Sequence, residues 1–292
     1  MSAVLKALAA PAANRPHLAG PVAPEFTFGG ADFERVRRLI FQRAGISLGP
    51  GKQAMVYSRL SRRLRETGHP SFGDYLQWLE HAHGPFADRE WQEFVNCLTT
   101  NLTSFFREEH HFQSLAAQLK QRPGARLRIW CSAASTGEEP YSIAMTCAEA
   151  ADGALGVQIV ASDIDTRVLA TAARGVYPAD APGLSRERLH AHFLRGKGLN
   201  SGYVRIKPEL ARHVEFRRLN LLDTPGLAVE PFDIVFCRNV MIYFDAETQR
   251  RVLEGLHASM KPGGLLFVGH SENFGAEKDL FRLCGKTTYQ RV

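Results

Sequence analysis

The stretch from Leu127 to Ser142, LRIWCSAASTGEEPYS, has the composition of a ligand cradle. It is typical of a buried strand, a turn of small residues and a helix start, which is where open α/β sheets hold nucleotides. The turn contains neither GxxxxGK[ST] nor GxGxxG, and Glu138 and Glu139 occupy the place where a pyrophosphate would have to lie. Carboxylates there favour a cationic or hydroxyl-rich ligand, and S-adenosylmethionine, with a sulfonium and no phosphate, fits that description. An acidic helix N-terminus without any ligand explains this stretch equally well.

Polar side chains also follow the next predicted strands. Asp163 ends the second strand, where an acidic residue usually accepts from ribose hydroxyls, and Asp165 is expected to cap the following helix. Asn220 follows the third strand, and Arg238 and Asn239 follow the fourth. Because parallel strands open at their carboxyl ends into one crevice, these groups are expected to converge. Each of them alone would more often be a loop-capping group.

The elements that must position these groups follow residue 126. Apolar, β-branched runs that alternate with helical segments predict a doubly wound, mostly parallel, Rossmann-like sheet covered on both faces. The segment of about 177–210 contains FLRGKGLNSGYVRIK and is too long for an ordinary connection, which predicts a small inserted β-subdomain. Strands are expected at Leu127–Cys131, Val157–Ser162, Val214–Leu219, Phe232–Cys237, Leu265–Gly269 and Thr287–Arg291, helices at about 139–151, 165–174, 246–260 and 276–283, and a turn at Lys261–Gly264.

The chain before the sheet reads as helical. Residues 1–25, rich in Ala and Pro, are expected to be a disordered tail, and residues 26–100 an all-helical domain. Asp32 is expected to cap the first helix. Residues 101–125 are expected to hold a linker helix that begins near Phe105 and brings Arg107 to the site of the domain formed by residues 126–292. Further helices are expected at about 52–67, 72–81 and 86–98.

Composition limits the function classes. The 292 residues carry a net charge of +6, which suggests an acidic partner but is not the imbalance of a dedicated DNA-binding protein. The five cysteines are widely spaced without a CxxC pair, which argues for a reducing cytosol and against disulfides or zinc. No apolar run is long enough to span a membrane. No metal site is expected, because the adjacent His110 and His111 should not share a helix face.

Five motifs carry a specific resemblance. They are NLTSFFR at 101–107, ASTGEEPYS at 134–142, ASDID at 161–165, FCRNVMIYF at 236–244 and GHSENF at 269–274. In this order and spacing they resemble the bacterial chemoreceptor glutamate methyltransferases, above all the enteric type. That family uses S-adenosylmethionine to esterify glutamates of chemotaxis receptors in the cytoplasm, releasing S-adenosylhomocysteine. The resemblance covers about residue 30 to the C-terminus and implies a seven-stranded methyltransferase sheet.

The same resemblance implies roles for individual residues. Arg107 and Tyr243 would face the transferred methyl group and the incoming carboxylate, as catalytic residues. Glu138 would meet the amino-acid or ribose end of S-adenosylmethionine, with Glu139 the less suitable partner, and Leu221 would contact the adenine through its backbone. The residues expected at the cofactor are Asn101, Thr103, Arg107, Glu138, Asp163, Asn220, Leu221, Arg238 and Asn239.

The chemistry agrees with this inventory. A substrate glutamate is already ionised near neutral pH, so its oxygen needs no strong general base. Catalysis would then rest on in-line placement and on desolvation of two opposite charges. Arg107 or Arg238 could hold the carboxylate by a bidentate contact, and Tyr243 could donate one hydrogen bond.

Two surfaces are candidates for receptor docking. Lys52, Arg59, Arg62 and Arg63 fall within about 100° on one face of the second helix, either as a ridge facing an acidic receptor helix or simply as a solvated face. The inserted hairpin, through Gly196, Gly198 and Gly202, is either a strand-addition site for a receptor tail or a glycine-rich loop.

Other functions were weighed against this one. A nucleic-acid methyltransferase would suit the basic charge, but Arg238-Asn239-Val240-Met241 replaces the [DNS]PP[YF] motif used on flipped bases. A nicotinamide dehydrogenase lacks its glycine fingerprint here. A cofactor-binding adaptor would not need Arg107 and Tyr243, and close relatives could modify other sensory proteins.

Overall fold

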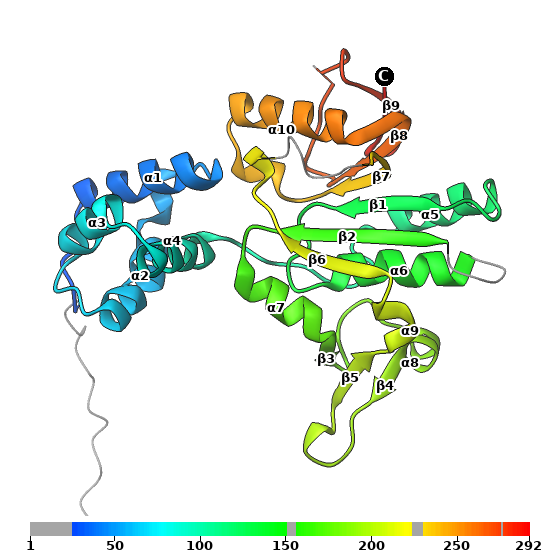
Figure 1. Cartoon of the computed structure of the whole chain (residues 1–292), viewed down its shortest axis with the longest axis horizontal. Coiled ribbons are helices and arrows are strands. Elements are labelled where there is room, and N and C mark those ends of the chain that lie inside the picture. Colours follow the sequence, from blue (N-terminus) through cyan, green and yellow to red (C-terminus); the bar gives the residue numbers. More distant parts are fainter. Residues whose placement is uncertain (1–24, 151–155, 224–229, 276) are drawn as a thin grey trace, which may run out of the picture.

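The structure is a computed structural model that describes residues 25–150, 156–223, 230–275 and 277–292. The tail expected at 1–25 lies almost entirely outside these ranges. Figure 1 shows a helical domain at one end of a twisted α/β sheet, with a second small sheet below it. No helix in the described ranges is long and apolar enough to cross a membrane.

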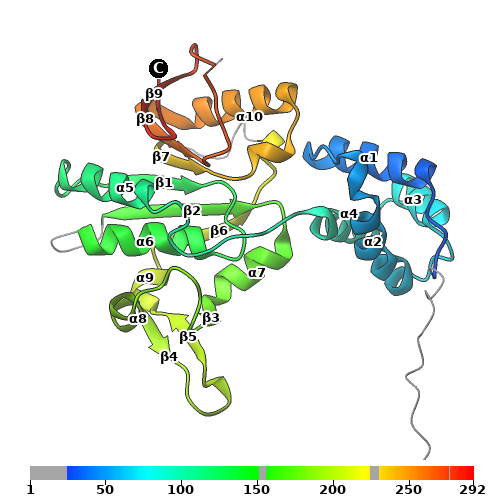
Figure 2. The ribbon, with the colours of Figure 1, turned by 180° about the vertical axis from the view of Figure 1, so that it is seen from behind.

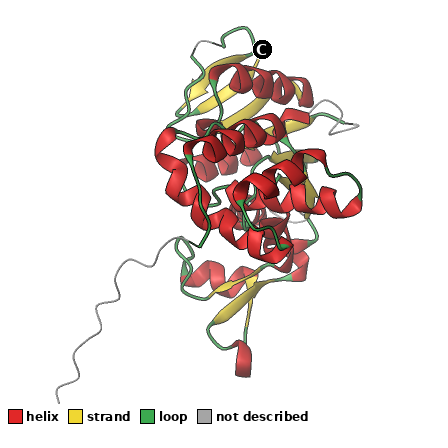
Figure 3. Cartoon of the chain, turned by 90° about the vertical axis from the view of Figure 1, so that its left-hand side faces the viewer, coloured by secondary structure: helices red, strands yellow, loops and turns green. Residues whose placement is uncertain are grey.

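The helical domain packs around its own apolar core. It contains α1 (Gly30–Ala44), α2 (Gln53–Thr67), α3 (Phe72–His81) and α4 (Pro85–Leu98), with a 3₁₀ turn η1 (Pro50–Lys52) before α2. Leu60, Phe72 and Phe94 are fully buried within this core. Figure 3, which views the molecule from this end, shows these helices in front of the strands.

The first helix begins three residues earlier than expected. Gly29 is the N-cap, and the Asp32 carboxylate accepts the Gly29 N–H at 2.9 Å. Asp32 is therefore the third helical residue of a capping box, and the prediction that it is the cap is wrong by position although the carboxylate does satisfy the helix start.

The large sheet has seven strands in the order β6-β2-β1-β7-β8-β10-β9. The first five of these pair in parallel, and β10 and β9 add antiparallel strands at one edge. Because β1 lies between β2 and β7, the strand order reverses there, and a crevice opens beyond the carboxyl ends of these strands. The strands are β1 (Leu127–Cys131), β2 (Val157–Asp163), β6 (Val214–Arg218), β7 (Phe232–Cys237), β8 (Met260–Val268), β9 (Phe281–Gly285) and β10 (Thr288–Arg291).

Helices cover both faces of this sheet, as predicted. Alternate residues such as Ile129 point to α5 (His110–Lys120) and α6 (Glu138–Ala150), with α7 (Thr166–Arg174) beside β6. Their neighbours, such as Trp130, point to α10 (Ala246–Ser259) on the other face. Figures 1 and 2 show the two layers from opposite sides.

A small antiparallel sheet is inserted after α7. Its order is β3-β5-β4, from Val176–Pro178, Tyr203–Ile206 and Phe193–Arg195. The predicted hairpin is thus confirmed and has a third strand, with α8 (Arg186–His192), η2 (Gly198–Asn200) and α9 (Pro208–Ala211) around it. Glu149 of α6 holds Arg188 of α8 through two hydrogen bonds of 2.9 and 3.0 Å, which fixes the insertion to the main domain.

Three local predictions are wrong. The linker helix begins at His110 rather than near Phe105, because Phe106 and Glu108 have left-handed φ values of 52° and 57°. The helix expected at 276–283 is not formed over the described residues 277–283, since Phe281–Gly285 pairs with β10 and sheet pairing overrides local propensity. Lys261–Gly264 lies within β8, as an irregularity in its pairing with β7.

Candidate active site

One cavity lies at the carboxyl edge of the large sheet, against the helical domain. It is lined by residues from the ends of β1, β2, β6 and β7 and from α1, α2 and the segment after α4. The predicted residues found in its lining are Asn101, Thr103, Arg107, Asp163, Asn220, Leu221, Arg238, Asn239 and Tyr243, together with Lys52. Glu138 is the one predicted cofactor residue that is not in this lining, and Glu139 takes its place.

The turn after β1 approaches the cavity with its backbone. Ser135, at a left-handed φ of 48°, donates its N–H to Asp163 Oδ2 at 2.8 Å. Gly137 has φ 101°, and a Cβ on it would lie 2.5 Å from the Tyr177 hydroxyl and 2.9 Å from the Ala172 Cβ. Glycine is therefore required at 137 both for its conformation and for the space. Such strained positions are typical of ligand sites.

Asp163 is buried at the end of β2. Besides the Ser135 N–H, it accepts the Asp165 N–H on Oδ1 at 3.0 Å. Burial raises the pKa of the Asp163 carboxyl to about 6, although these backbone hydrogen bonds oppose the rise. A buried carboxylate that is still ionised at neutral pH suits the ribose hydroxyls of a nucleoside, which are donors.

The two acidic residues of α6 have different surroundings. Glu138 is half-buried and accepts a hydrogen bond from Thr136 Oγ1 at 2.6 Å. Glu139 is buried, accepts from Cys131 Sγ at 3.2 Å and pairs with Arg238 at 2.6 Å. Of the two carboxylates, it is Glu139 that lines the cavity. The preference for Glu138 at the cofactor stays a prediction.

Arg238 is a buried structural cation. Its side chain is 0% exposed, and besides Glu139 it contacts the Arg107 carbonyl oxygen and lies 3.5 Å from Glu108 Oε2. These partners occupy both terminal nitrogens and leave only the buried Nε without one among the described residues, so Arg238 is not free to hold a substrate carboxylate by a bidentate contact.

Arg107 lies on the loop before α5. Its Nη1 donates to the Leu102 carbonyl oxygen at 3.0 Å, and the part of the chain that the structure describes supplies no ion pair to it. Of the two arginines proposed for the substrate carboxylate, Arg107 is the one whose charge is still available.

The loop that carries Asn239 and Tyr243 is held by Glu272. This buried carboxylate accepts the N–H groups of Gly269, Asn239, Val240 and Met241 at 2.5 to 3.0 Å. Burial raises the pKa of Glu272 against these hydrogen bonds. In the sequence Glu272 is only one residue of the GHSENF motif, and its four donors are revealed only by the folded loop.

Asn220 and Leu221 lie at the seam between the two domains. The Asn220 Nδ2 donates to the Arg43 carbonyl oxygen of α1 at 2.9 Å, and its Oδ1 accepts from Leu222 N–H at 3.2 Å. Leu221 is 7% exposed in the 3₁₀ turn η3 (Leu221–Asp223). Asn220 therefore positions this corner of the cavity as well as lining it.

The four predicted docking cations occupy different environments. Lys52 lines the cavity, and Arg59 donates to the carbonyl oxygens of Cys97 and Thr99 at the end of α4. Arg62 is exposed and pairs with Glu66 at 2.6 Å. The expectation that Arg63 belongs to the same exposed face is corrected, since it is 7% exposed and its Nε donates to Glu90 at 2.9 Å.

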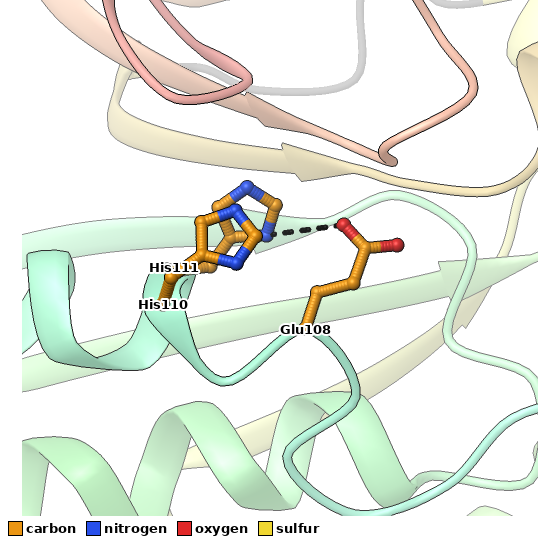
Figure 4. Close-up of side chains that lie close together, drawn as sticks. All are labelled: Glu108, His110 and His111. Carbon is orange, nitrogen blue, oxygen red and sulfur yellow. Dashed lines mark ion pairs between the residues drawn. The ribbon is translucent and has the colours of Figure 1, made fainter.

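Glu108, His110 and His111 gather beside the cavity (Figure 4), with ligand-type atoms within 4.8 Å of one another. The expectation that the two histidines diverge is wrong, because both rings approach Thr287 Oγ1, at 3.2 and 2.7 Å. Burial, reinforced by the charge of Arg238, lowers the pKa of His111 to about 3. Because Arg238 already faces Glu108, a metal ion here would meet a buried positive charge.

This fold and site define a class of protein. A doubly wound sheet whose switch-point cavity presents the buried carboxylates of Asp163 and Glu139, and whose first turn has no glycine-rich phosphate motif, suits an S-adenosylmethionine-dependent methyltransferase. The chain matches the model of the "CheR methyltransferase, SAM binding domain" over residues 101–290 and that of the "CheR methyltransferase, all-alpha domain" over residues 31–99. The chain belongs to the CheR methyltransferase family, and S-adenosylmethionine is its cofactor.

Curated relatives agree over most of the chain. The chemotaxis protein methyltransferase of Klebsiella aerogenes is 50% identical over 92% of this chain and 92% of its own, and that of Escherichia coli K12 is 50% identical over 89% and 90%. Chemotaxis protein methyltransferase 2 of Pseudomonas aeruginosa is 50% identical over 91% and 94%. The predicted resemblance to the enteric type is confirmed, and a nucleic-acid enzyme, a dehydrogenase or a mere adaptor is not favoured.

Solved structures are more distant. An O-methyltransferase family protein from Burkholderia thailandensis gives a TM-score of 0.35 at 14% identity, covering 73% of this chain and 52% of that one. PKMT2 from Rickettsia typhi in complex with AdoHcy gives 0.35 at 13% identity, covering 58% and 26%.

Proposed function

We propose that this protein transfers a methyl group from S-adenosylmethionine to glutamate side-chain carboxylates of chemotaxis receptors. The observation that carries the proposal is the cavity at the edge of the large sheet. In its lining the buried Asp163 carboxylate accepts hydrogen bonds, and the Arg107 guanidinium has no ion pair among the described residues. The family and the names of the relatives supply the receptor as substrate.

The residues of this chain would do three things. Asp163, Asn101 and the Ser132–Ser135 turn would hold the nucleoside, and the amino-acid part would lie toward α6. S-Adenosylmethionine supplies an electrophilic methyl group on a positively charged sulfur. Arg107 would hold the incoming glutamate carboxylate, which is already ionised, and Tyr243 would donate to its second oxygen. Catalysis then consists of placement and exclusion of water, without proton transfer.

Labelled methyl transfer to receptor-rich membranes tests this function. Wild-type protein should place a base-labile label on the receptor, because carboxyl methyl esters hydrolyse in base. Arg107→Ala and Tyr243→Phe should lower turnover while S-adenosylhomocysteine still binds. Label that is stable to base, label on nucleic acid, or full turnover in both variants would contradict the proposal.

We also propose that the exposed face of α2 meets the helical cytoplasmic region of the receptor, which is expected to be acidic. Arg59 donates to the Thr99 carbonyl oxygen at the end of α4, so changing it would also disturb the fold there. The exposed Arg62 is therefore the better residue with which to test receptor binding. Arg62→Glu should weaken receptor methylation at subsaturating receptor, whereas Arg282→Glu, the same charge change on the distant β9, should not. Equal effects of both would indicate a nonspecific charge effect instead.

The small sheet is proposed as a second contact, for a receptor tail added beside β4. Leu194 and Tyr203 are half-exposed there, at 49% and 50%. The glycines have other duties: a Cβ on Gly196 would lie 2.0 Å from the Asn200 carbonyl oxygen, and Gly198 and Gly202 have positive φ. A labelled receptor tail peptide should bind wild type and bind Leu194→Glu more weakly; no binding to wild type would exclude the tether.

Cytoplasmic location belongs to the same proposal. The five cysteines are all unpaired, which suits a reducing compartment.

A further inference from the structure

A single carboxylate, that of Asp165, joins three parts of the molecule. Its Oδ1 accepts the N–H groups of Arg167 and Val168 at 2.8 and 3.3 Å, which caps α7 as the sequence predicts. Its Oδ2 accepts from Thr99 Oγ1 at 2.7 Å and from Asn101 Nδ2 at 2.8 Å. A helix cap needs only the first pair, so the second pair requires another explanation.

The backbone of Asp165 completes the connection. Its N–H donates to Asp163 Oδ1 at 3.0 Å, and Asp163 is the carboxylate expected at the cofactor ribose. Asp165 itself is 2% exposed and does not line the cavity. It can therefore influence the cofactor only through the residues that it holds.

The turn around Asp165 is also where α4 docks. Gln92 Nε2 donates to the Ile164 carbonyl oxygen at 2.8 Å. Asn96 exchanges two hydrogen bonds with Thr166, at 3.0 and 3.2 Å. The last turn of the helical domain is thus fixed against the turn that follows β2.

The segment that follows this contact, residues 99–104, is not held by regular secondary structure. Residues 99–104 form neither helix nor strand, and their side of the cavity carries Asn101, Thr103 and, further on, Arg107. Asn101 is held by Asp165 through its side chain and by Ser135 Oγ through its carbonyl oxygen, at 2.8 Å. At the far end of the segment the Phe106 N–H donates to Ser142 Oγ at 3.0 Å, so residues 99–104 depend on the side-chain bonds of Thr99 and Asn101 for their position.

We infer that Asp165 is a positioning residue for methyl transfer: it fixes the segment Thr99–Arg107 over the cavity in register with Asp163. Both halves of the cofactor site then take their position from one turn, the β2–α7 connection. This inference rests on the proposed function for its activity readout, but not for its binding readout.

Asp165→Ser separates the two duties of the carboxylate. Serine still caps α7, but its single oxygen cannot also accept from Thr99 and Asn101. Asp245→Ser is the matched control, because Asp245 caps α10 through the Thr248 N–H at 2.9 Å and has no partner across the domains among the described residues. The probe is S-adenosylhomocysteine, titrated into the full-length protein by calorimetry.

Asp165→Ser is expected to weaken S-adenosylhomocysteine binding by tenfold or more, to lower kcat, and to speed amide exchange in residues 100–104. Asp245→Ser is expected to change affinity and exchange in that segment less than twofold. Affinity and exchange near wild type in Asp165→Ser would overturn the inference.

A second pair of variants covers the case in which Asp165→Ser does not fold. Thr99→Val removes one donor to Asp165 at constant shape, and Thr99→Ser keeps it. The valine variant should lose S-adenosylhomocysteine affinity about fivefold or more with faster exchange in residues 100–104, and the serine variant should retain both. Equal behaviour of the two variants would overturn the inference. If wild type binds the probe but methylates no receptor, the proposed function fails while this test stands.

Discussion

The cavity at the carboxyl edge of the large sheet and the exposed face of α2 differ in how well the sequence predicts the surroundings of their charged residues. In the cavity, Asp163, Arg238 and Asn239 lie where the ends of their strands put them, and the charges of Asp163 and Arg238 both have buried hydrogen-bond partners. On α2 and the turn before it, the four cations expected to share a helical face by periodicity have four different surroundings. Sheet topology determines where a strand end points, whereas helical periodicity says nothing about what packs against the helix.

The largest expected effect sharpens this contrast on α2 itself. Arg63→Ala would leave Glu90 buried without its cation, while Glu90 still accepts from the Tyr75 hydroxyl at 2.8 Å. Loss of one partner of a buried pair costs about 3 kcal/mol or more. Arg62→Ala, one residue earlier and exposed, should leave the free energy of unfolding unchanged in urea. Equal losses would show that the two arginines do not differ as described.

A second test addresses the turn after β1. Gly137→Ala would force a side chain into left-handed backbone and against the Tyr177 hydroxyl, and should cost about 2 kcal/mol. Thermal unfolding should show the loss, and S-adenosylhomocysteine should bind more weakly. Gly68→Ala, at φ 74° with open space around the missing Cβ, is the control for conformation without the clash. Its loss should be the smaller of the two.

Glu272→Gln tests how the loop of Asn239 and Tyr243 is held. The glutamine amide nitrogen would face backbone donors that now meet a carboxylate oxygen, at a cost of about 1 to 3 kcal/mol. We expect lower turnover with faster amide exchange in residues 239–243. Unchanged turnover would mean that this loop holds its shape without the carboxylate.

The smallest expected effect is the pH dependence of stability and of cofactor affinity that Asp163 causes. Because the Asp163 pKa is about 6 when folded, well above its usual value of 3.8, stability from this group is full below about pH 4 and is lost as pH rises through 6. Cofactor binding needs the ionised form and should respond in the opposite direction. Affinity for S-adenosylhomocysteine should therefore fall up to about tenfold per pH unit below 6, and Asp163→Asn should remove that slope. A slope that persists in the variant would assign the titration to another group.

The sequence predicts the site better than its surroundings, for physical reasons. Strand ends, helix starts and turn residues follow from local pattern, which is why β1, β2, β6 and β7 fall where expected. The wrong helix at 276–283 and the late start of α5 depend on sheet pairing and on two left-handed residues, Phe106 and Glu108, that no local pattern signals.

The sequence also could not predict which residues pair with the buried charged side chains. The pairing of Arg63 with Glu90, and the bonds from the N–H groups of residues 239–241 to Glu272, join segments far apart in the chain. Asp165 is the intermediate case, since its cap on α7 is local and predictable but its bonds to Thr99 and Asn101 span more than sixty residues.

The central claim is that the cavity at the switch point of the sheet holds the methyl donor. Calorimetric titration of the purified chain with S-adenosylhomocysteine tests it most directly, with Asp163→Ala measured alongside. The account predicts one saturable site in the wild type and at least a tenfold loss of affinity in the variant. No heat of binding in the wild type, or equal affinity in both proteins, would contradict it.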